Sequence, residues 1–167
     1  MDESADAVRP LETADLPALL ALNNAQSIEL GLLGPEALGR QVLAAALAIA
    51  IGPPGAPEAF LVAFDQDAPP QGPNHAWFLS RHPRFLYVDR ICVRPRARRR
   101  GLARALYAHA LAEAARRGAP FVCCEVNSDP PNPVSDALHA ALGFYEVGRA
   151  FLADRGKSVR YLERKAF

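Results

Sequence analysis

The chain has 167 residues, of which 50% are hydrophobic and 22% charged, and its formal net charge is +1. This length and composition are typical of one globular domain spanning residues 1–167, and they exclude a disordered chain. A net charge so close to zero argues against a protein whose whole surface binds nucleic acid or membrane.

The N-terminal sequence MDESADAVRP is acidic and has no apolar run, so we expect no signal peptide. The longest apolar run, residues 42–51, is too short to cross a bilayer and stops at Gly-Pro-Pro. The three cysteines, Cys92, Cys123 and Cys124, lack zinc-like spacing and are expected to be reduced core thiols. The histidines show no ligand spacing either. We therefore expect a soluble, cytoplasmic protein without a metal.

The first third of the chain predicts a strand, two helices and a hairpin. A short strand is expected at residues 8–12, followed by a helix over 16–30 with a proline in its first turn. Gly-Pro begins a second helix over 35–45. Two apolar segments, 46–51 and 58–65, flank a Pro- and Gly-rich stretch, which is typical of a β-hairpin.

The middle of the chain contains the clearest strand and helix. Residues 66–75 are interpreted as a loop, and the aromatic segment 76–83 gives no clear prediction. Residues 85–93 predict a strand, 101–118 a helix ended by glycine, and 121–126 another strand.

The last part predicts a short helix at 135–144 and two terminal strands at 144–151 and 158–166. Strands and helices are therefore mixed along the whole chain. This order is typical of an α/β fold, in which helices cover both faces of a single sheet.

Arginines gather in residues 94–104, RPRARRRGLAR, between a predicted strand and a predicted helix. The free N–H groups and the dipole at the start of a helix favour an anion. Gly101 lets the backbone approach a phosphate closely, and Arg98, Arg99 and Arg100 can add charged contacts. The sequence matches neither a P-loop nor a GxGxxG loop. A solvated basic surface is the alternative on these residues alone.

The pattern Arg98-x-x-Gly101-x-Ala103, which follows a strand ending in ICV, resembles the acetyl-CoA pyrophosphate loop of the GNAT superfamily of N-acetyltransferases. A second segment, NPVSDALHAALGFYEVG at residues 132–148, is similar to the family's Asn-x-x-Ala-x-x-x-Tyr-x-x-x-Gly-Phe segment. The resemblance covers residues 85–148. The longer string CEVNSDPPNPVSDALH…LGF, which begins at residue 124, is also similar to a bacterial subgroup of predicted acetyltransferases.

The resemblance implies an α/β (α+β) single domain. Its mixed sheet would have six or seven strands, splayed in the middle, with about four helices on both faces. Acetyl-CoA, the implied cosubstrate, would lie in the gap between the strand that ends at Val93 and the strand at residues 121–126. No metal is implied. The residues implied to bind acetyl-CoA are Ile91, Cys92, Val93, Arg98, Arg99, Arg100, Gly101, Leu102, Ala103, Arg104, Asn132 and Ser135.

Two of these residues have specific implied roles. The backbone N–H of Val93 would hold the thioester carbonyl and stabilise the oxyanion that forms there. Asn132 would bond the pantetheine arm, although a turn residue before Pro133 is an equal interpretation.

Two carboxylates compete for the role of the base that takes the proton of the amine. Asp89 lies four residues before Val93, and strand alternation predicts that Asp89, Val93, Tyr87 and Ile91 share one face. Glu125 lies on the next strand. The alternative for Asp89 is an ion pair with Arg90 or Arg149, and the alternative for Glu125 is a solvated strand end.

His139 stands where the family commonly has a tyrosine that assists the leaving thiolate. A histidine can donate an N–H and is a competent acid, so we list it as a catalytic candidate. A histidine on the packed face of a helix is the alternative. Asn23, Trp77 and Tyr87 are candidate acceptor-binding residues, although Asn23 could be a solvated helix residue and Trp77 a core residue.

The predicted function is transfer of an acetyl group from acetyl-CoA to a primary amine by direct attack in a ternary complex. The acceptor would be a small-molecule or peptide amine, with no nucleic acid or membrane partner, and the protein could be a homodimer. The first alternative is a silent acyl-CoA-binding module. The second is a nucleic-acid binder that uses residues 94–104, but that segment lacks the interleaved aromatic residues expected of one.

Overall fold

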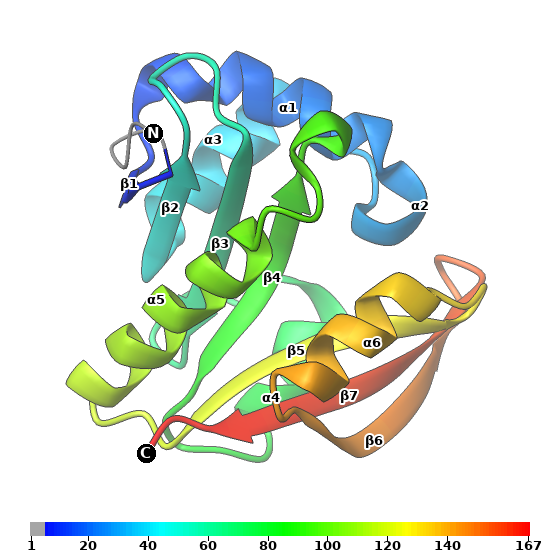
Figure 1. Ribbon diagram of the computed structural model, residues 1–167. Coiled ribbons are helices and arrows are strands. Elements are labelled where there is room, and N and C mark those ends of the chain that lie inside the picture. Colours follow the sequence, from blue (N-terminus) through cyan, green and yellow to red (C-terminus); the bar gives the residue numbers. More distant parts are fainter. Residues whose placement is uncertain (1–5) are drawn as a thin grey trace.

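The computed structural model describes residues 6–167, which form one seven-stranded sheet in the order β1-β2-β3-β4-β5-β7-β6 (Figure 1). The strands are β1 (Val8–Pro10), β2 (Leu47–Ile51), β3 (Ala59–Asp65), β4 (Leu86–Val93), β5 (Phe121–Asp129), β6 (Tyr145–Leu152) and β7 (Lys157–Lys165). The helices are α1 (Leu16–Ala25), α2 (Ser27–Leu30), α3 (Pro35–Ala44), α4 (Gly72–Leu79), α5 (Leu102–Arg116) and α6 (Pro133–Ala141), with 3₁₀ turns η1 (Thr13–Asp15) and η2 (Pro95–Ala97). The expected mixed sheet is confirmed.

The sheet opens between β4 and β5, the only parallel pair among the described strands. These strands pair only at their beginnings, where Leu86 meets Val122 and Tyr87 meets Cys123. Beyond this point they diverge, and Figure 1 shows a V-shaped opening between the end of β4 and β5. The predicted splay is therefore present where it was expected.

A β-bulge interrupts β4 at Asp89. On β3, Val62 pairs with Arg90 and the next residue, Ala63, pairs with Val88, so Asp89 is an extra residue. A bulge shifts the alternation of side chains by one position. The prediction that Tyr87, Ile91 and Val93 share a face is wrong for this reason: Tyr87 belongs to one core cluster, and Ile91 and Val93 pack against the other.

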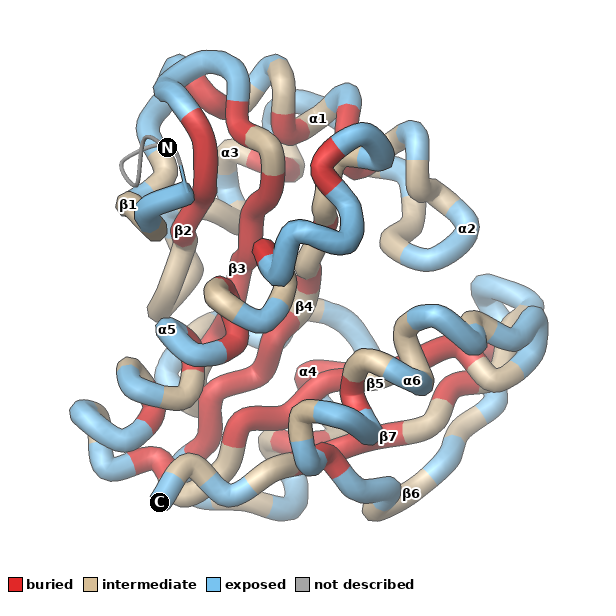
Figure 2. Tube along the Cα trace, in the orientation of Figure 1, coloured by how far each residue is buried: buried red, intermediate tan, exposed pale blue. Residues whose placement is uncertain are grey.

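Helices cover the sheet on both faces, and each face has its own core (Figure 2). Helix α5 buries Leu102, Leu106 and Tyr107 against one face, which α6 also covers. Helices α1, α3 and α4 cover the other face, with Leu19, Leu38 and Phe78 among the buried residues. These apolar side chains recur with helical spacing, so burying them fixes the side of the sheet on which each helix lies.

Two helices differ from the sequence-based expectation. The predicted helix at 16–30 breaks at Gln26, which leaves helical geometry and directs its side-chain amide to Cys92 Sγ at 3.0 Å and to the Val93 carbonyl at 3.4 Å. Helix α4 replaces part of the predicted loop. It begins at Gly72, has Pro73 in its first turn, and buries His75. The prolines of residues 66–75 suggested a loop, whereas a proline is also favoured in a first helical turn.

The three cysteines are free and buried, as predicted. None of the helices in residues 6–167 is both long enough and apolar enough to cross a membrane.

Candidate active site

Two cavities meet where β4 and β5 separate. The larger, of about 970 Å³, lies on the face covered by α5 and α6, and the smaller, of about 260 Å³, lies on the face covered by α4. Asp89 on β4 and Glu125 on β5 line both cavities. The two carboxylates therefore stand at the junction between two spaces that could hold two reactants.

The start of α5 forms one wall of the large cavity. Gly101 precedes the helix with φ +77°, and a Cβ placed on it would meet no atom within 4 Å. The space beside Gly101 is therefore open, and the N–H groups of a first helical turn have no partner within the helix, as an anion site requires. Most of the residues implied by the resemblance line this cavity: Ile91, Val93, Arg98, Arg99, Gly101, Leu102, Ala103, Arg104, Asn132 and Ser135.

The arginines of residues 94–104 do not form one uniform cationic surface. Arg96 pairs with Glu58 at 2.8 Å, and Arg100 pairs with Asp6, so the Arg100 side chain does not line the cavity as expected. Within residues 6–167, Arg98, Arg99 and Arg104 have no ion-pair partner, and all three line the cavity. Their charge is therefore available to a polyphosphate in the cavity.

Cys92 and Val93 face different surroundings. The Cys92 side chain is 2% exposed and packs beneath α1, in the core opposite to the large cavity, so it cannot contact a ligand there. The N–H of Arg94 donates to the Glu58 carbonyl at 2.7 Å, toward β3. Because successive N–H groups point to alternate edges of a strand, the N–H of Val93 points to the open edge of β4. It is a fixed donor at the split in the sheet.

Asn132 stands at the N-cap of α6. Its side-chain oxygen accepts a hydrogen bond from the backbone N–H of Ser135 at 3.2 Å. This cap satisfies one of the free N–H groups of the helix. The side-chain N–H₂ of Asn132 remains to serve a ligand, so the turn interpretation and the ligand interpretation are compatible.

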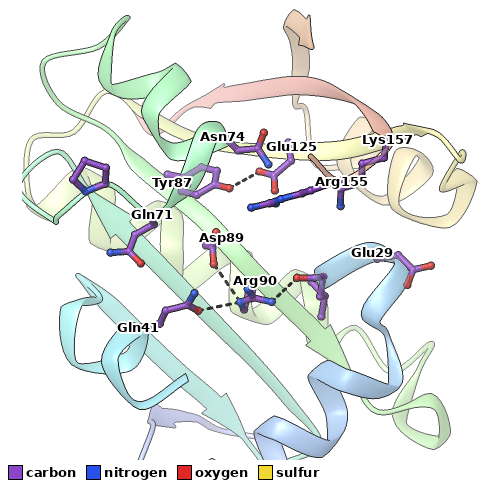
Figure 3. A pocket seen from close by; sticks show the side chains of 13 residues that line it. Glu29, Gln41, Gln71, Asn74, Tyr87, Asp89, Arg90, Glu125, Arg155 and Lys157 are labelled. Carbon is purple, nitrogen blue, oxygen red and sulfur yellow. Dashed lines mark hydrogen bonds and ion pairs between the residues drawn. The ribbon is translucent and has the colours of Figure 1, made fainter. Parts of the chain in front are cut away.

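Glu125 has the environment of a base that works near neutrality. The Tyr87 hydroxyl donates to its Oε2 at 2.6 Å (Figure 3). Burial and the negative charge of Asp89 raise the pKa of Glu125 to about 7, although the bond from Tyr87 opposes this change. A solvated strand end does not describe this residue.

Asp89 forms an ion pair with Arg90, which the sequence analysis gave as the alternative to a catalytic role. Its Oδ2 lies 3.3 Å from Arg90 Nε, but it is buried and has no hydrogen-bond partner. Burial raises the pKa of Asp89, and the charge of Arg90 opposes that rise. Arg149, the other expected partner, pairs with Glu146 instead. Oδ2 of Asp89 therefore has the charge of Arg90 beside it but no hydrogen-bond donor.

His139 lines the large cavity but both of its ring nitrogens are occupied. Nδ1 lies 2.7 Å from the Ser135 carbonyl, which can only accept, so Nδ1 carries the proton. Nε2 then accepts from the Tyr107 hydroxyl at 2.6 Å. Burial lowers the pKa of His139 and favours this neutral form. The expected acid therefore has no proton on the nitrogen that faces Tyr107.

Tyr107 is a residue of the large cavity that the sequence analysis missed. It is fully buried on the inner face of α5, beside Leu106 and Ala110. A tyrosine hydroxyl on an otherwise apolar helix face needs a polar partner, and this was the signal in the sequence.

Of the candidate acceptor-binding residues, only Tyr87 lines the small cavity. Asn23 is buried and binds the Gly31 carbonyl at 2.8 Å while accepting from Arg90 at 2.7 Å. Trp77 stacks on Tyr161 with ring centroids 4.2 Å apart. Asn23 and Trp77 are therefore structural residues, and the expectation that they contact the acceptor is wrong.

The small cavity also has polar residues that the sequence analysis did not identify. They come from α2, α3, α4, the β6–β7 turn and β7: Glu29, Gln41, Asn74, Arg155 and Lys157 (Figure 3). No sequence motif links these residues, because only the tertiary structure brings them together.

Solved structures of N-acetyltransferases share this fold. The ribosomal-protein-S18-alanine N-acetyltransferase of Escherichia coli is 21% identical, with 96% of this chain and 93% of that chain covered and a TM-score of 0.69. The ribosomal-protein-alanine N-acetyltransferase of Brucella melitensis is 22% identical, with 95% and 99% covered and a TM-score of 0.71. NAA60 of Arabidopsis thaliana, solved with acetyl-CoA, is 15% identical, with 95% and 97% covered and a TM-score of 0.73.

Among curated proteins, none is a significant match to the sequence. The model of the acetyltransferase (GNAT) family matches residues 59–144, which include the hairpin strand β3, the split between β4 and β5, the start of α5 and the whole of α6. This match spans just over half of the chain, and the protein therefore belongs to the GNAT family of acetyltransferases, which use acetyl-CoA as cosubstrate.

Proposed function

We propose that the protein holds acetyl-CoA in the large cavity and an amine in the small cavity, and transfers the acetyl group directly between them. The observation that carries this proposal is the meeting of the two cavities at Asp89 and Glu125, in the split of the sheet. Reactants held on either side of one opening need no covalent enzyme intermediate, because proximity makes the attack effectively unimolecular.

Glu125 acts as the base in this proposal. An ammonium group cannot attack a thioester, so its proton passes to the Glu125 carboxylate before or during attack. The nitrogen then forms a bond to the carbonyl carbon, and the N–H of Val93 stabilises the resulting oxyanion. Collapse of this intermediate breaks the C–S bond, and the electron pair leaves with the CoA sulfur. The amine nitrogen, still cationic after the attack, gives up its second proton to the departing thiolate or to water, which yields the amide and CoA. The pKa of about 7 for Glu125 suits this role near neutral pH.

Tyr107 assists the leaving thiolate, and His139 positions Tyr107. The Tyr107 hydroxyl lines the large cavity, and in the resting site its single proton is donated to neutral His139 Nε2, which holds the phenol in place. To assist the thiolate, the hydroxyl turns this proton from His139 Nε2 toward the sulfur. Burial raises the pKa of Tyr107, so a hydrogen bond to the thiolate is favoured over full proton transfer. In this proposal the histidine at position 139 replaces the family tyrosine by orienting a phenol from another helix.

Tyr107→Phe should lower turnover by about 10- to 100-fold, the usual value of one hydrogen bond to a charged group, while acetyl-CoA still binds. His139→Phe should cause a smaller loss. The double variant should be no slower than Tyr107→Phe, because His139 acts only through its hydrogen bond to Tyr107 and has no effect once that hydroxyl is gone. Steady-state rates and acetyl-CoA affinity measured for all three variants test this. Additive losses would show that His139 acts independently.

The two alternative functions gain no support from the site. A silent binding module has no need of a buried carboxylate with a pKa of about 7 between the cavities. A nucleic-acid binder would present its arginines together on the surface, whereas Arg96 and Arg100 are paired with acidic residues. The free, buried cysteines support the further proposal of a reducing, cytoplasmic compartment.

The activity is tested with a panel of amine acceptors and acetyl-CoA, by following the release of free CoA thiol. The panel contains free amino acids, polyamines, aminoglycosides and short peptides with free N-termini. The peptides are included because the similar solved structures include ribosomal-protein-alanine N-acetyltransferases. We expect amine-dependent thiol release with at least one class. Tight binding of acetyl-CoA without release for any acceptor would favour the silent module.

A further inference from the structure

The small cavity combines two kinds of charge around one small space. Asp89 and Glu125 come from the split of the sheet, whereas Arg155 and Lys157 come from the β6–β7 turn and the start of β7 (Figure 3). The cavity volume of about 260 Å³ lies below the usual range of about 300–1,000 Å³ for drug-sized ligands. Its occupant is therefore small and experiences both signs of charge.

The nearest arginine, Arg90, is not available to a ligand. It is buried and donates to Asn23 Oδ1 at 2.7 Å, to the Leu30 carbonyl at 2.5 Å and to Gln41 Oε1 at 3.1 Å, and it lies beside Asp89. All of these contacts are internal. Arg90 thus ties α1, α2 and α3 to β4.

Arg155 and Lys157 lack such partners. Lys157 is half-buried, and among residues 6–167 no acidic side chain lies within ion-pair distance of it. Arg155 has only a 3.9 Å contact with the exposed Asp154. Burial lowers the pKa of Lys157; the negative charge of Glu125 opposes this change, and the nearby Arg155 adds to it. An anion in the cavity would compensate both cations.

Arg155 also reaches across the cavity. Its Nη2 lies 3.3 Å from the position that a Cβ on Gly72 would occupy, so the arginine extends from the β6–β7 turn to the first residue of α4. Both Gly72 and Arg155 line the cavity. Arg155 therefore connects the two sides of the cavity that the β6–β7 turn and α4 supply.

The acidic side of the cavity offers a site for an amine. Asp89 Oδ2 is buried without a hydrogen-bond donor, and Glu125 accepts only the Tyr87 hydroxyl at its Oε2. An ammonium group has three donors, and both carboxylates line the cavity. Because Asp89 Oδ2 already lies beside Arg90, the amine would approach the other oxygen of Asp89 while one of its protons faces Glu125.

We propose that the acceptor is a small zwitterion, an amino acid whose amine binds between Asp89 and Glu125 and whose carboxylate binds Arg155 and Lys157. This inference rests on the proposed acetyl transfer and defines its acceptor class. An acceptor without a carboxylate leaves the two cations uncompensated, and a peptide places an amide where the carboxylate belongs. Both therefore react more slowly than the free amino acid.

The test compares each of the standard free amino acids with its C-terminal amide and with a dipeptide that begins with the same residue. For the best amino acid, kcat/KM for thiol release should exceed that of its amide by about 10- to 100-fold, because a charged hydrogen-bonded pair is lost. Lys157→Gln and Arg155→Gln should each reduce this ratio, mainly through KM, and the double variant should bring it close to one.

Arg149→Gln is the matched control, because Arg149 lies on the same hairpin but is exposed, pairs with Glu146 and does not line the cavity. It should retain the ratio of the unmodified protein. Melting temperatures confirm that all variants fold. If amides or dipeptides react as fast as the free amino acids, the zwitterion proposal is wrong while the proposed function stands. If no amine reacts although acetyl-CoA binds, the proposed function itself is overturned, and this inference with it.

Discussion

Glu125→Gln is expected to reduce turnover by about 10²–10⁴-fold above pH 7, with the affinity for acetyl-CoA retained, because it removes a positioned base. In the unmodified protein, activity should rise with pH through about 7, as the Glu125 carboxyl loses its proton and becomes able to accept one. This rise should disappear in the variant. Rates measured as kcat and kcat/KM from about pH 5 to 9 test the prediction.

Asp89→Asn is the matched comparison for this carboxylate. The charge of Asp89 contributes to the raised pKa of Glu125, so its removal should move the rise in activity to lower pH without abolishing it. Asp89→Asn should also increase KM for the acceptor if Asp89 binds the amine. The opposite result, in which Asp89→Asn loses the pH-dependent step and Glu125→Gln keeps it, would assign the base to Asp89.

Protein stability provides an independent measurement of the same pKa. The folded-state pKa of about 7 lies above the ordinary value of 4.5, so the folded protein binds the proton more tightly than the unfolded chain does. Burial of this carboxyl therefore costs stability progressively as pH rises from about 4.5 to about 7. Glu125→Gln removes that cost, and its melting temperature relative to the unmodified protein should increase over the same interval.

Gly101→Glu is expected to abolish the stabilisation of the protein by CoA and acetyl-CoA. A ligand at a hundred times its Kd stabilises the native state by about 2.7 kcal/mol, which corresponds to a rise of about 5–10 °C in Tm for a chain of this size. The open space above Gly101, at the first turn of α5, would receive a carboxylate that repels the pyrophosphate. Thermal melts with and without CoA measure the loss.

Gly118→Glu controls for backbone strain. Gly118 has φ +67°, close to the +77° of Gly101, but it lies beyond the other end of α5 and does not line the large cavity. Both variants should therefore lose a comparable amount of intrinsic stability, because a side chain is disfavoured at positive φ. Only Gly101→Glu should lose the response to CoA. A normal response in folded Gly101→Glu would exclude the start of α5 as the pyrophosphate site.

The sequence was informative where the physical cause is local. One short segment contains the end of strand β4 at Val93, then Gly101, and then the apolar face of α5. A helix N-terminus binds anions through its own backbone. The proposed pyrophosphate site could therefore be predicted from consecutive residues. The hairpin of β2 and β3 was equally accessible, because its turn residues lie between its two apolar strands.

The tertiary structure decided the features that depend on distant partners. The bulge at Asp89 exists only in the pairing with β3, and it changes which β4 side chains reach each cavity. Tyr107 meets His139 across 32 positions of the chain, and since the Ser135 carbonyl fixes the histidine's proton on Nδ1, this contact leaves His139 Nε2 as an acceptor. The cations at the small cavity come from the β6–β7 turn and the start of β7, which sequence spacing does not relate to Glu125. Charge compensation and side-chain alternation depend on which strands become neighbours, and one sequence read along its length does not contain that information directly.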